Sequence, residues 1–176
     1  MERQNNMNTD DCEEIELITP ATELFRRLLP VARSIFTATF AGRFDHAEFE
    51  RFCDSVYEPG GSMLREFEVP DVRWQIAVVA NEPIGYAKLT PLRAPAKKAA
   101  EGAVELEQLY VLPRWHGRGV ADRLMKWTLQ AAHAAGAPEI YLTVFDHNER
   151  AKRFYYRHGF REVGSCTFQL GSRIDD

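Results

Sequence analysis

Apolar residues along this chain follow two different spacings. Between residues 24 and 57 they stand three or four positions apart, which is the spacing of one face of an α-helix. Between residues 74 and 112 they alternate with polar residues or form short runs, as they do in strands. After residue 120 the helical spacing returns in two segments, separated by a short apolar run. The pattern therefore predicts a domain that contains both helices and strands.

The N-terminal third is predicted to hold one short strand followed by helices. Residues 15–19 form the strand, and the helical spacing then runs over residues 24–40 with Pro30 inside it. Because proline has no N–H group and clashes with the preceding turn, we expect a break or kink there, with a second helix starting at that point. Residues 45–57 form another amphipathic helix, with acidic residues on its polar side.

The remaining two thirds of the chain does not follow a strict alternation of strand and helix. We therefore predict an α/β fold with a mixed sheet and helices on its faces, and not an all-parallel sheet. The first two strands form a hairpin around Asn81-Glu82-Pro83. The predicted elements are strands over residues 74–79, 84–89 and 104–112, a helix over 120–135, a strand over 140–145, a helix over 149–158, and one or two strands over 160–170.

Length and composition are those of a globular protein with one domain. The 176 residues are 45% hydrophobic and 27% charged, close to the globular average. We expect a single domain over residues 13–176, after a frayed polar tail over residues 1–12. No apolar run approaches the roughly 20 residues that span a bilayer, and the N-terminus lacks the basic and apolar regions of a signal peptide. No membrane partner is therefore expected.

Cysteines, histidines and net charge narrow the classes of partner. Cys12, Cys53 and Cys166 are far apart and form no CxxC motif, and no Cys/His cluster has metal-binding spacing. Neither a disulfide framework nor a metal site is indicated, and a reducing cytoplasm fits best. The net charge of -4 argues against nucleic acid and leaves a cationic substrate open.

A glycine-containing loop at residues 109–121 joins a predicted strand to the long predicted helix. A helix N-terminus offers free N–H groups and about half a positive charge. Gly117 and Gly119 let the backbone approach a phosphate closely, and nearby arginines add positive charge, so the expected ligand is a phosphate or pyrophosphate. Judged from these residues alone, a glycine-containing turn with solvated arginines is the alternative.

Two familiar phosphate-binding loops do not match this segment. A dinucleotide fingerprint requires a third glycine or alanine where Asp122 stands, and it places the glycines directly after the strand, whereas four residues intervene here. An aspartate in the first turn would repel a close pyrophosphate unless it points away. A Walker A loop requires Gly-Lys-Ser/Thr, which is absent.

Two motifs resemble those of the GNAT superfamily of N-acetyltransferases. The first is Arg114-x-x-Gly117-x-Gly119 after a strand that ends in Val-x-Pro, and the second is Asn148-x-x-Ala151-x-x-Phe154-Tyr155-x-x-x-Gly159-Phe160. The resemblance covers roughly residues 74–170. It implies a mixed, mostly antiparallel central sheet with helices on both faces, and acetyl-coenzyme A (acetyl-CoA) as the cofactor.

Three shorter segments are similar to the PaiA-type branch, described as polyamine (spermidine/spermine) acetyltransferases. They are Phe168-Gln169-Leu170-Gly171, Phe36-x-x-Thr39-Phe40 and the run from Glu105 to Val111. The resemblance thus implies direct acetyl transfer to a primary amine, with a polyamine or another small amine as the acceptor. A peptide or protein acceptor, and an acyl-CoA-binding module without turnover, are the alternatives. Related enzymes are often dimers, so a homodimer is one expected assembly.

The resemblance also implies roles for single residues. Tyr155 stands at the position of the general acid, and a phenol with a pKa of about 10 can protonate a thiolate whose conjugate acid is near 8.5. A core aromatic is the other interpretation of Tyr155, since Phe154 and Tyr156 flank it. The implied cofactor-binding residues are Leu109, Tyr110 and Val111 for the pantetheine arm, Gly117, Arg118, Gly119, Val120, Ala121 and Asp122 with Arg114 for the pyrophosphate, and Asn148 and Tyr155 for the cofactor arm.

The general base is predicted among acids on the third long strand. By alternation, Glu105, Glu107, Leu109 and Val111 share one face. Related enzymes often use a strand glutamate here, commonly through a water, so Glu107 and Glu105 are the candidate bases. Exposed strand carboxylates without a catalytic role are the alternative. Other candidate bases are Asp146 and His147, and the acids that could attract a polyamine or simply form a solvated helix face are Asp45, Glu48, Glu50, Asp54 and Glu58.

Overall fold

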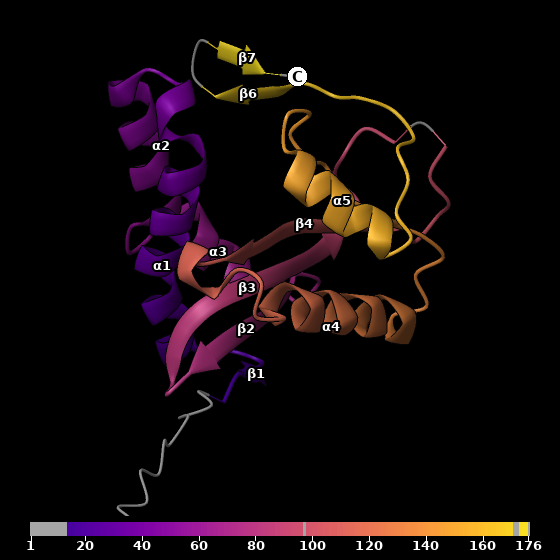
Figure 1. The fold of residues 1–176 in the computed structure, drawn as a ribbon, viewed down its shortest axis with the longest axis horizontal. Coiled ribbons are helices and arrows are strands. Elements are labelled where there is room, and N and C mark those ends of the chain that lie inside the picture. Colours follow the sequence, from indigo (N-terminus) through magenta and orange to yellow (C-terminus); the bar gives the residue numbers. More distant parts are fainter. Residues whose placement is uncertain (1–13, 97, 171–172, 176) are drawn as a thin grey trace, which may run out of the picture.

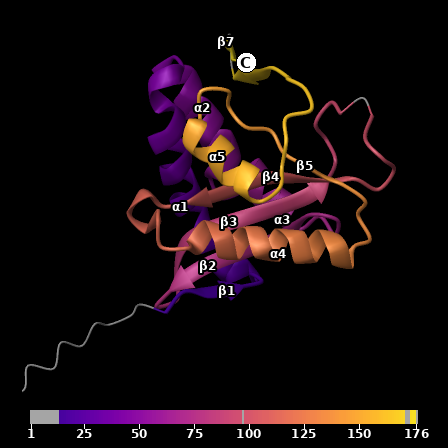
Figure 2. The ribbon, with the colours of Figure 1, turned by 45° about the vertical axis from the view of Figure 1, so that its right-hand side comes forward.

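A five-stranded sheet forms the centre of the protein in a computed structural model that describes residues 14–96, 98–170 and 173–175. The strands lie in the order β1-β2-β3-β4-β5, and the first four are antiparallel neighbours, whereas β5 is parallel to β4 (Figures 1 and 2). This confirms the predicted mixed, mostly antiparallel sheet. The strands are β1 (Glu16–Ile18), β2 (Arg73–Val79), β3 (Glu82–Pro91), β4 (Val104–Val111) and β5 (Ile140–Tyr141).

Helices cover both faces of the sheet and enclose two hydrophobic cores. On one face, Phe25 and Leu28 pack against Trp74 and Tyr86. On the other, Leu124 and its neighbours pack against Leu106, Ile84 and Ala77. The covering helices are α1 (Thr22–Phe40), α2 (His46–Tyr57) and α3 (Ser62–Phe67) on the first face, and α4 (Val120–Ala134) with α5 (Glu149–Arg157) beside it on the second (Figure 1).

Helix α1 continues through Pro30 as a single helix, so the predicted start of a second helix there is wrong. Proline removes one helical hydrogen bond and crowds the preceding turn. Pro30 itself is exposed, whereas Leu28, Leu29 and Ala32 on either side of it are buried. Burial of the apolar stripe along the whole helix outweighs the local cost, because tertiary packing supplies most of the stability of a helix in a protein.

Two predicted strands are shorter or lie elsewhere. The strand predicted over residues 140–145 ends at Tyr141. Residues 161–167 form no regular element, and β6 (Phe168–Leu170) pairs with β7 (Arg173–Asp175) in a separate two-stranded sheet. Helix α3 was not predicted, because six residues are too few for a helical period to be recognised. The tail predicted over residues 1–12 lies outside the described residues.

Among the residues described, no helix combines the length and the apolar character needed to cross a bilayer. The same residues contain no group of three or more His, Cys, Asp or Glu side chains that could hold a metal ion. Cys53 and Cys166 are free thiols, and Cys12 lies outside the described part of the chain.

Candidate active site

Strands β4 and β5 separate after a very short ladder. Of the residues that the structure describes, only Val104 and Glu105 of β4 pair with β5, through Ile140 and Tyr141. From Leu106 onward, β4 pairs only with β3 within the described residues. Half of the backbone N–H and C=O groups of a strand point to each edge, so this edge of β4 offers hydrogen-bonding groups to an extended ligand lying beside it.

The loop after β4 opens directly onto the N-terminus of α4. A short 3₁₀ turn (Pro113–Trp115) is anchored by the buried ring of Trp115. Gly117 and Gly119 have φ values of 76° and 78°, the left-handed region that favours glycine. A Cβ atom at either position would meet nothing within 4 Å, so the space over both glycines is open.

The charges around this loop fit an anionic ligand. The first N–H groups of α4, at Val120, Ala121 and Asp122, have no partner within the helix. Arg114 and Arg118 are exposed beside them, and the Arg118 guanidinium lies 4.8 Å from the centre of the Trp115 ring. The loop therefore has the backbone geometry and the cations of a pyrophosphate site.

Asp122 is the acid that could oppose a phosphate here. Its Oδ1 lies 2.9 Å from Nε2 of His158, at the C-terminal end of α5. The carboxylate is thus directed at the neighbouring helix and carries a partner there. Its position in the first turn of α4 is compatible with a phosphate over the glycines.

Helix α5 carries Asn148 and Tyr155. The Asn148 side chain caps the helix, since its Oδ1 accepts a hydrogen bond of 3.1 Å from the N–H of Ala151. Tyr155 is half-buried, and its ring packs edge-on against Phe154 and Phe160. Burial raises the pKa of Tyr155 to about 12, so the phenol keeps its proton at neutral pH. The side chain has both a packing role and an available acid proton.

A β-bulge changes the predicted faces of β4. The register pairs Lys88 with Gln108 but Leu89 with Leu106, so Glu107 is the extra residue. Glu107 binds Lys88, whose ammonium also binds Glu66 of α3 on one face of the sheet, whereas Leu109 and Val111 pack with the α4 core on the other. The prediction that Glu105, Glu107, Leu109 and Val111 share one face is therefore wrong. An inserted residue interrupts the alternation of side chains between the two faces of a strand.

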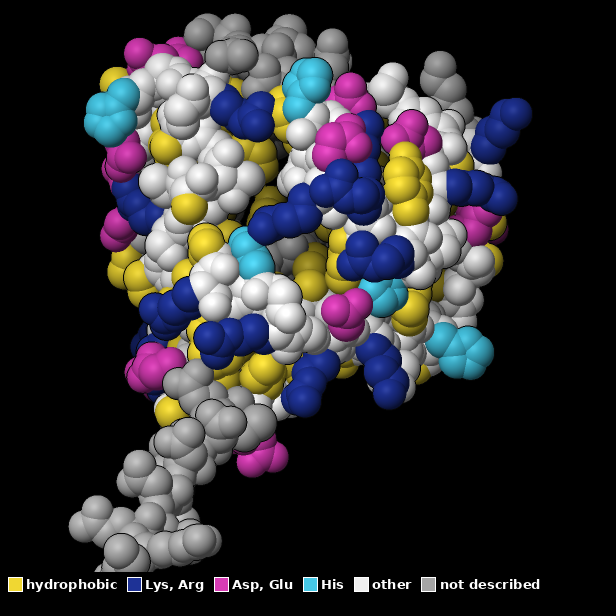
Figure 3. Space-filling model, viewed as in Figure 1, with side chains coloured by type: hydrophobic (Ala, Val, Ile, Leu, Met, Phe, Trp, Pro, Cys, Tyr) yellow, Lys and Arg dark blue, Asp and Glu magenta, His cyan; other side chains and the backbone are white. Residues whose placement is uncertain are grey.

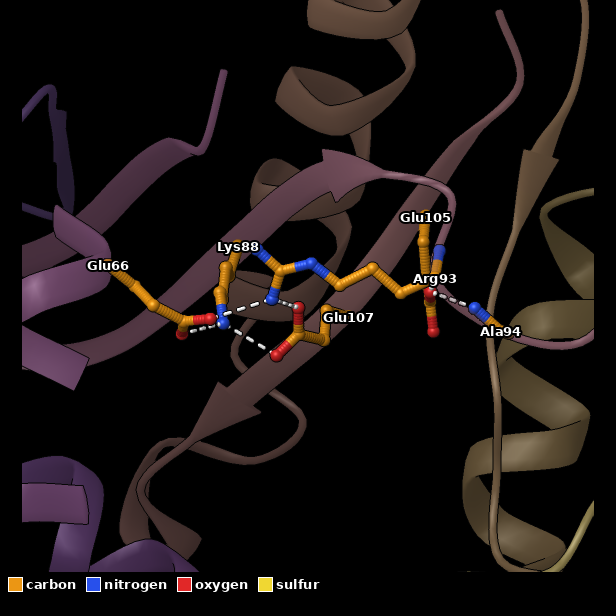
Figure 4. Close-up of polar contacts among 6 residues, drawn as sticks. All are labelled: Glu66, Lys88, Arg93, Ala94, Glu105 and Glu107. Carbon is orange, nitrogen blue, oxygen red and sulfur yellow. Dashed lines mark hydrogen bonds and ion pairs between the residues drawn. The ribbon is translucent and has the colours of Figure 1, made fainter. Parts of the chain in front are cut away.

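Glu107 belongs to a four-residue ionic cluster, which we call the Lys88 cluster: Glu66 of α3, Lys88 of β3, Arg93 and Glu107 (Figure 4). The buried Nζ of Lys88 binds the Glu66 carboxylate and lies 2.5 Å from Oε1 of Glu107. Nη1 of Arg93 lies 2.7 Å from Oε1 of Glu66 and 3.0 Å from Oε2 of Glu107. Two cations thus balance two carboxylates.

The Lys88 cluster sets the ionisation of Glu66. Partial burial alone would raise the pKa of Glu66, but hydrogen bonds from Lys88 and Arg93 outweigh it and hold that pKa below its usual 4.5. We did not predict Glu66, Lys88 or Arg93 as site residues from the sequence. Lys88 carries the one available signal, because it is a charged residue within the apolar run of residues 84–89.

Glu105 has a different environment. Its side chain is buried, and Oε2 accepts hydrogen bonds from the backbone N–H groups of Arg93 (3.0 Å) and Ala94 (2.8 Å). The carboxylate therefore holds the loop that follows β3 (Figure 4).

The other candidate bases, Asp146 and His147, lie exposed before α5. Asp146 pairs with Lys152, which hydrogen-bonds the carboxylate and lowers the pKa of Asp146. The His147 ring meets the Phe145 ring edge-on, with 5.5 Å between the ring centres.

The acidic residues on and next to α2 make contacts within the layer of helices. The side chain of Asp45 caps α2 by accepting a hydrogen bond from the N–H of Glu48. Arg33 of α1 contacts the other three acids, Glu50, Asp54 and Glu58, at 2.7–3.1 Å. One guanidinium balances only one of these three negative charges, so this group of four side chains keeps a net negative charge.

Comparison with known proteins identifies the class. The sequence model described as the acetyltransferase (GNAT) family matches residues 29–160, which is most of the chain. The chain therefore belongs to the acetyltransferase (GNAT) family, a family of acyl-transferring enzymes. The superfamily predicted from the two motifs is confirmed.

Individual relatives match only part of the chain. An uncharacterized N-acetyltransferase of Mycobacterium tuberculosis is 40% identical over 93 residues, which is 53% of this chain and 55% of that protein. The chain thus matches about half the length of this curated relative. The spermine/spermidine N(1)-acetyltransferase of Bacillus subtilis is 32% identical over 68 residues, 38% of this chain and 45% of that protein.

Among solved structures, the fold is similar to the PaiA N-acetyltransferase of Thermoplasma acidophilum, which was solved in complex with coenzyme A. The TM-score is 0.74 at 22% identity, and the match covers 87% of this chain and 93% of that chain. This similarity supports the fold described above, a central sheet with helices on both faces.

Proposed function

We propose that this protein transfers an acetyl group from acetyl-CoA directly to the primary amine of a small molecule, with a polyamine as the first candidate acceptor. The observation that carries the proposal is the unpaired edge of β4, which leads straight into the open glycine loop. An extended pantetheine arm matches the strand edge, and a pyrophosphate matches the loop at its end.

Cofactor binding is assigned to these two neighbouring features. Backbone groups between Leu109 and Val111 bind the pantetheine arm along the edge of β4. The segment from Gly117 to Asp122 binds the pyrophosphate, with Arg114 and Arg118 adding positive charge. Acetyl-CoA supplies the activated thioester, and the protein supplies position and protons.

Tyr155 is proposed as the general acid. The amine nitrogen bonds to the acetyl carbon as the carbon–sulfur bond breaks, and the leaving thiolate takes the phenolic proton. The raised pKa of Tyr155 keeps this proton in place until a strong base, the thiolate, forms beside it. The resulting phenolate regains a proton from the medium, which completes the cycle.

Glu107 is proposed as the general base, acting through a water. The carboxylate is partly exposed, with 27% of the side chain accessible, and the cations of the Lys88 cluster hold it in place. Glu105 is not proposed as the base, because its carboxylate already holds two backbone N–H groups in a buried position.

A polyamine acceptor is supported by three observations. The chain is similar to a spermine/spermidine acetyltransferase and, in fold, to PaiA. The net charge of -4 favours a cationic ligand. The group formed by Arg33 with Glu50, Asp54 and Glu58 keeps a net negative charge that attracts ammonium groups.

The direct test is release of free thiol from acetyl-CoA in the presence of spermidine, spermine and a panel of smaller amines and peptides. We expect turnover with at least one small amine and the highest kcat/KM with a polyamine. Turnover with peptides alone would refute the small-amine acceptor. Tight binding of coenzyme A in calorimetry without turnover on any acceptor would refute the enzymatic function.

A further inference from the structure

His116 connects the phosphate-binding loop to α5. Its Nε2 lies 2.9 Å from the carbonyl oxygen of Val111, the last residue of β4. Its Nδ1 lies 2.7 Å from Nη1 of Arg150, in the first turn of α5. The ring therefore touches the strand edge and the helix from a position directly before Gly117.

The chemistry of the two partners determines the state of the ring. A guanidinium can only donate, so Nδ1 of His116 must accept from Arg150. A carbonyl can only accept, so Nε2 must carry the hydrogen and donate to Val111. In this arrangement the lone pair of Nδ1 directs the Arg150 side chain to the loop.

Helix α5 is placed by apolar packing of Phe154 and Tyr155 and by polar contacts at its ends. It has no fully buried residue, in contrast to α4, where five residues are buried. The described contacts that join its ends to the loop and α4 are both made by histidines: His116 with Arg150 at the N-terminal end, and His158 with Asp122 at the C-terminal end.

Arg150 is exposed, and within the described residues no carboxylate is paired with it. One of its five N–H groups is used by His116, which leaves an ionised donor fork beside the glycine loop. Figure 3 shows Lys and Arg side chains gathered over α4 and α5, around a hollow with hydrophobic side chains at its floor. A phosphate is the ligand that suits a planar, fixed guanidinium in such surroundings.

We propose that Arg150 binds a phosphate group of coenzyme A and that His116 is the positioning residue that holds Arg150 for this contact. The inference rests on the proposed function, since it requires the cofactor in the loop. It adds a residue of α5 to the cofactor site, so that cofactor binding ties the helix that carries Asn148 and Tyr155 to the loop. The phosphate is either one of the pyrophosphate groups or the 3′-phosphate.

The test is calorimetric titration of the wild type and variants with coenzyme A and with dephospho-coenzyme A. We expect Arg150→Ala to raise the Kd about tenfold, the equivalent of one charge-assisted contact. The Kd of Arg150→Lys, which keeps the charge but not the forked donor geometry, should lie between those of the wild type and Arg150→Ala. Loss with both ligands assigns the pyrophosphate, and loss with coenzyme A alone assigns the 3′-phosphate.

His116→Ala tests the positioning role. It should raise the Kd about threefold, and the double variant with Arg150→Ala should bind no more weakly than Arg150→Ala alone, because His116 acts through Arg150. In kinetics, both single variants should raise the KM for acetyl-CoA and change kcat by less than about twofold. Arg153→Ala, an exposed arginine one turn further along α5, is the matched control and should bind like the wild type.

Two outcomes would overturn the inference while leaving the proposed function intact. One is wild-type affinity in Arg150→Ala, and the other is an additive loss in the double variant. Failure of the wild type to bind coenzyme A would instead refute the proposed function. Thermal unfolding of each variant separates a binding defect from misfolding.

Discussion

The ammonium nitrogen of Lys88 lies 2.5 Å from Oε1 of Glu107, so the proposed base is an ion-pair partner of a buried lysine. Nη1 of Arg93 lies 3.0 Å from the other carboxylate oxygen, Oε2, so both oxygens of Glu107 are held by cations. Glu107 therefore suits a role in which a water carries the proton of the amine and the carboxylate stabilises the positive charge that develops. Direct transfer of the amine proton to the Glu107 carboxylate fits this arrangement less well.

Removal of Lys88 should cost stability. In Lys88→Met, the carboxylates of Glu66 and Glu107 lose their buried cation, and we expect a loss of about 3 kcal/mol in the free energy of unfolding. Urea denaturation measures it. The exposed pair of Arg27 with Glu82 gives the control, since Arg27→Met should cost less than about 1 kcal/mol. Equal losses in the two variants would contradict the structural importance of the Lys88 cluster.

Acid should weaken the protein through Glu66. The folded-state pKa of Glu66 is below its usual 4.5, so ionised Glu66 contributes stability above pH 4.5, and this contribution is lost as the pH falls through the folded-state pKa. We expect Glu66→Gln to be less stable than the wild type at pH 7, and the difference to shrink towards zero below that pKa. Denaturation at several pH values measures it. A difference that stays constant with pH would disprove the assignment.

Glu107 and Glu105 should respond differently to substitution. Glu107→Gln should lower kcat/KM for the amine about 100-fold, as expected for the loss of a general base. Glu105→Ala should act on stability, because two backbone N–H groups lose their acceptor, at a cost of about 1–3 kcal/mol. Steady-state kinetics measures the effect of each variant on turnover, and urea denaturation measures its effect on stability. The roles would be reversed if Glu105→Ala folded normally and lost turnover.

Tyr155→Phe should lower kcat about 100-fold, with little change in the KM for acetyl-CoA, because it removes a proton donor and keeps the ring packing. Tyr156→Phe is the matched control, since this neighbouring phenol is exposed and donates to Glu162. With the pKa of Tyr155 at about 12, no loss of activity from its ionisation is expected up to about pH 10. Similar activity of the two variants would remove Tyr155 from the mechanism.

Gly119→Ala should affect both folding and cofactor binding. Its φ of 78° is strained for alanine, at a cost of about 1–2 kcal/mol, and the added methyl group occupies the open space over the loop. We expect a lower Tm and a higher Kd for coenzyme A. Gly42→Ala is the control, because that glycine has open space around it and no positive φ. An unchanged Kd in Gly119→Ala would place the pyrophosphate elsewhere.

Periodic elements and local motifs were predictable from the sequence. The sheet, the long helices and the glycine loop follow from apolar spacing and from the special backbone needs of Gly117 and Gly119. Asn148 is recognisable because a helix cap and a family motif coincide at one residue. These features depend on neighbours in sequence, so the sequence exposes them.

The features that were missed depend on neighbours in space. The bulge at Glu107 moves a carboxylate across the sheet, and nothing in the local pattern of β4 announces an inserted residue. The pairing of Lys88 with Glu66 joins a strand to a six-residue helix that has no recognisable period. Continuation of α1 through Pro30 depends on burial along the whole helix, and local propensity alone predicts the opposite.

The early separation of β4 from β5 has a consequence for the protein without its ligand. An unpaired strand edge is a template on which another chain can add a strand, and this is a common origin of aggregation. In the proposed complex the pantetheine arm covers that edge. Bound coenzyme A would then also protect the protein against self-association. We expect preparations depleted of coenzyme A to precipitate earlier than preparations that contain it.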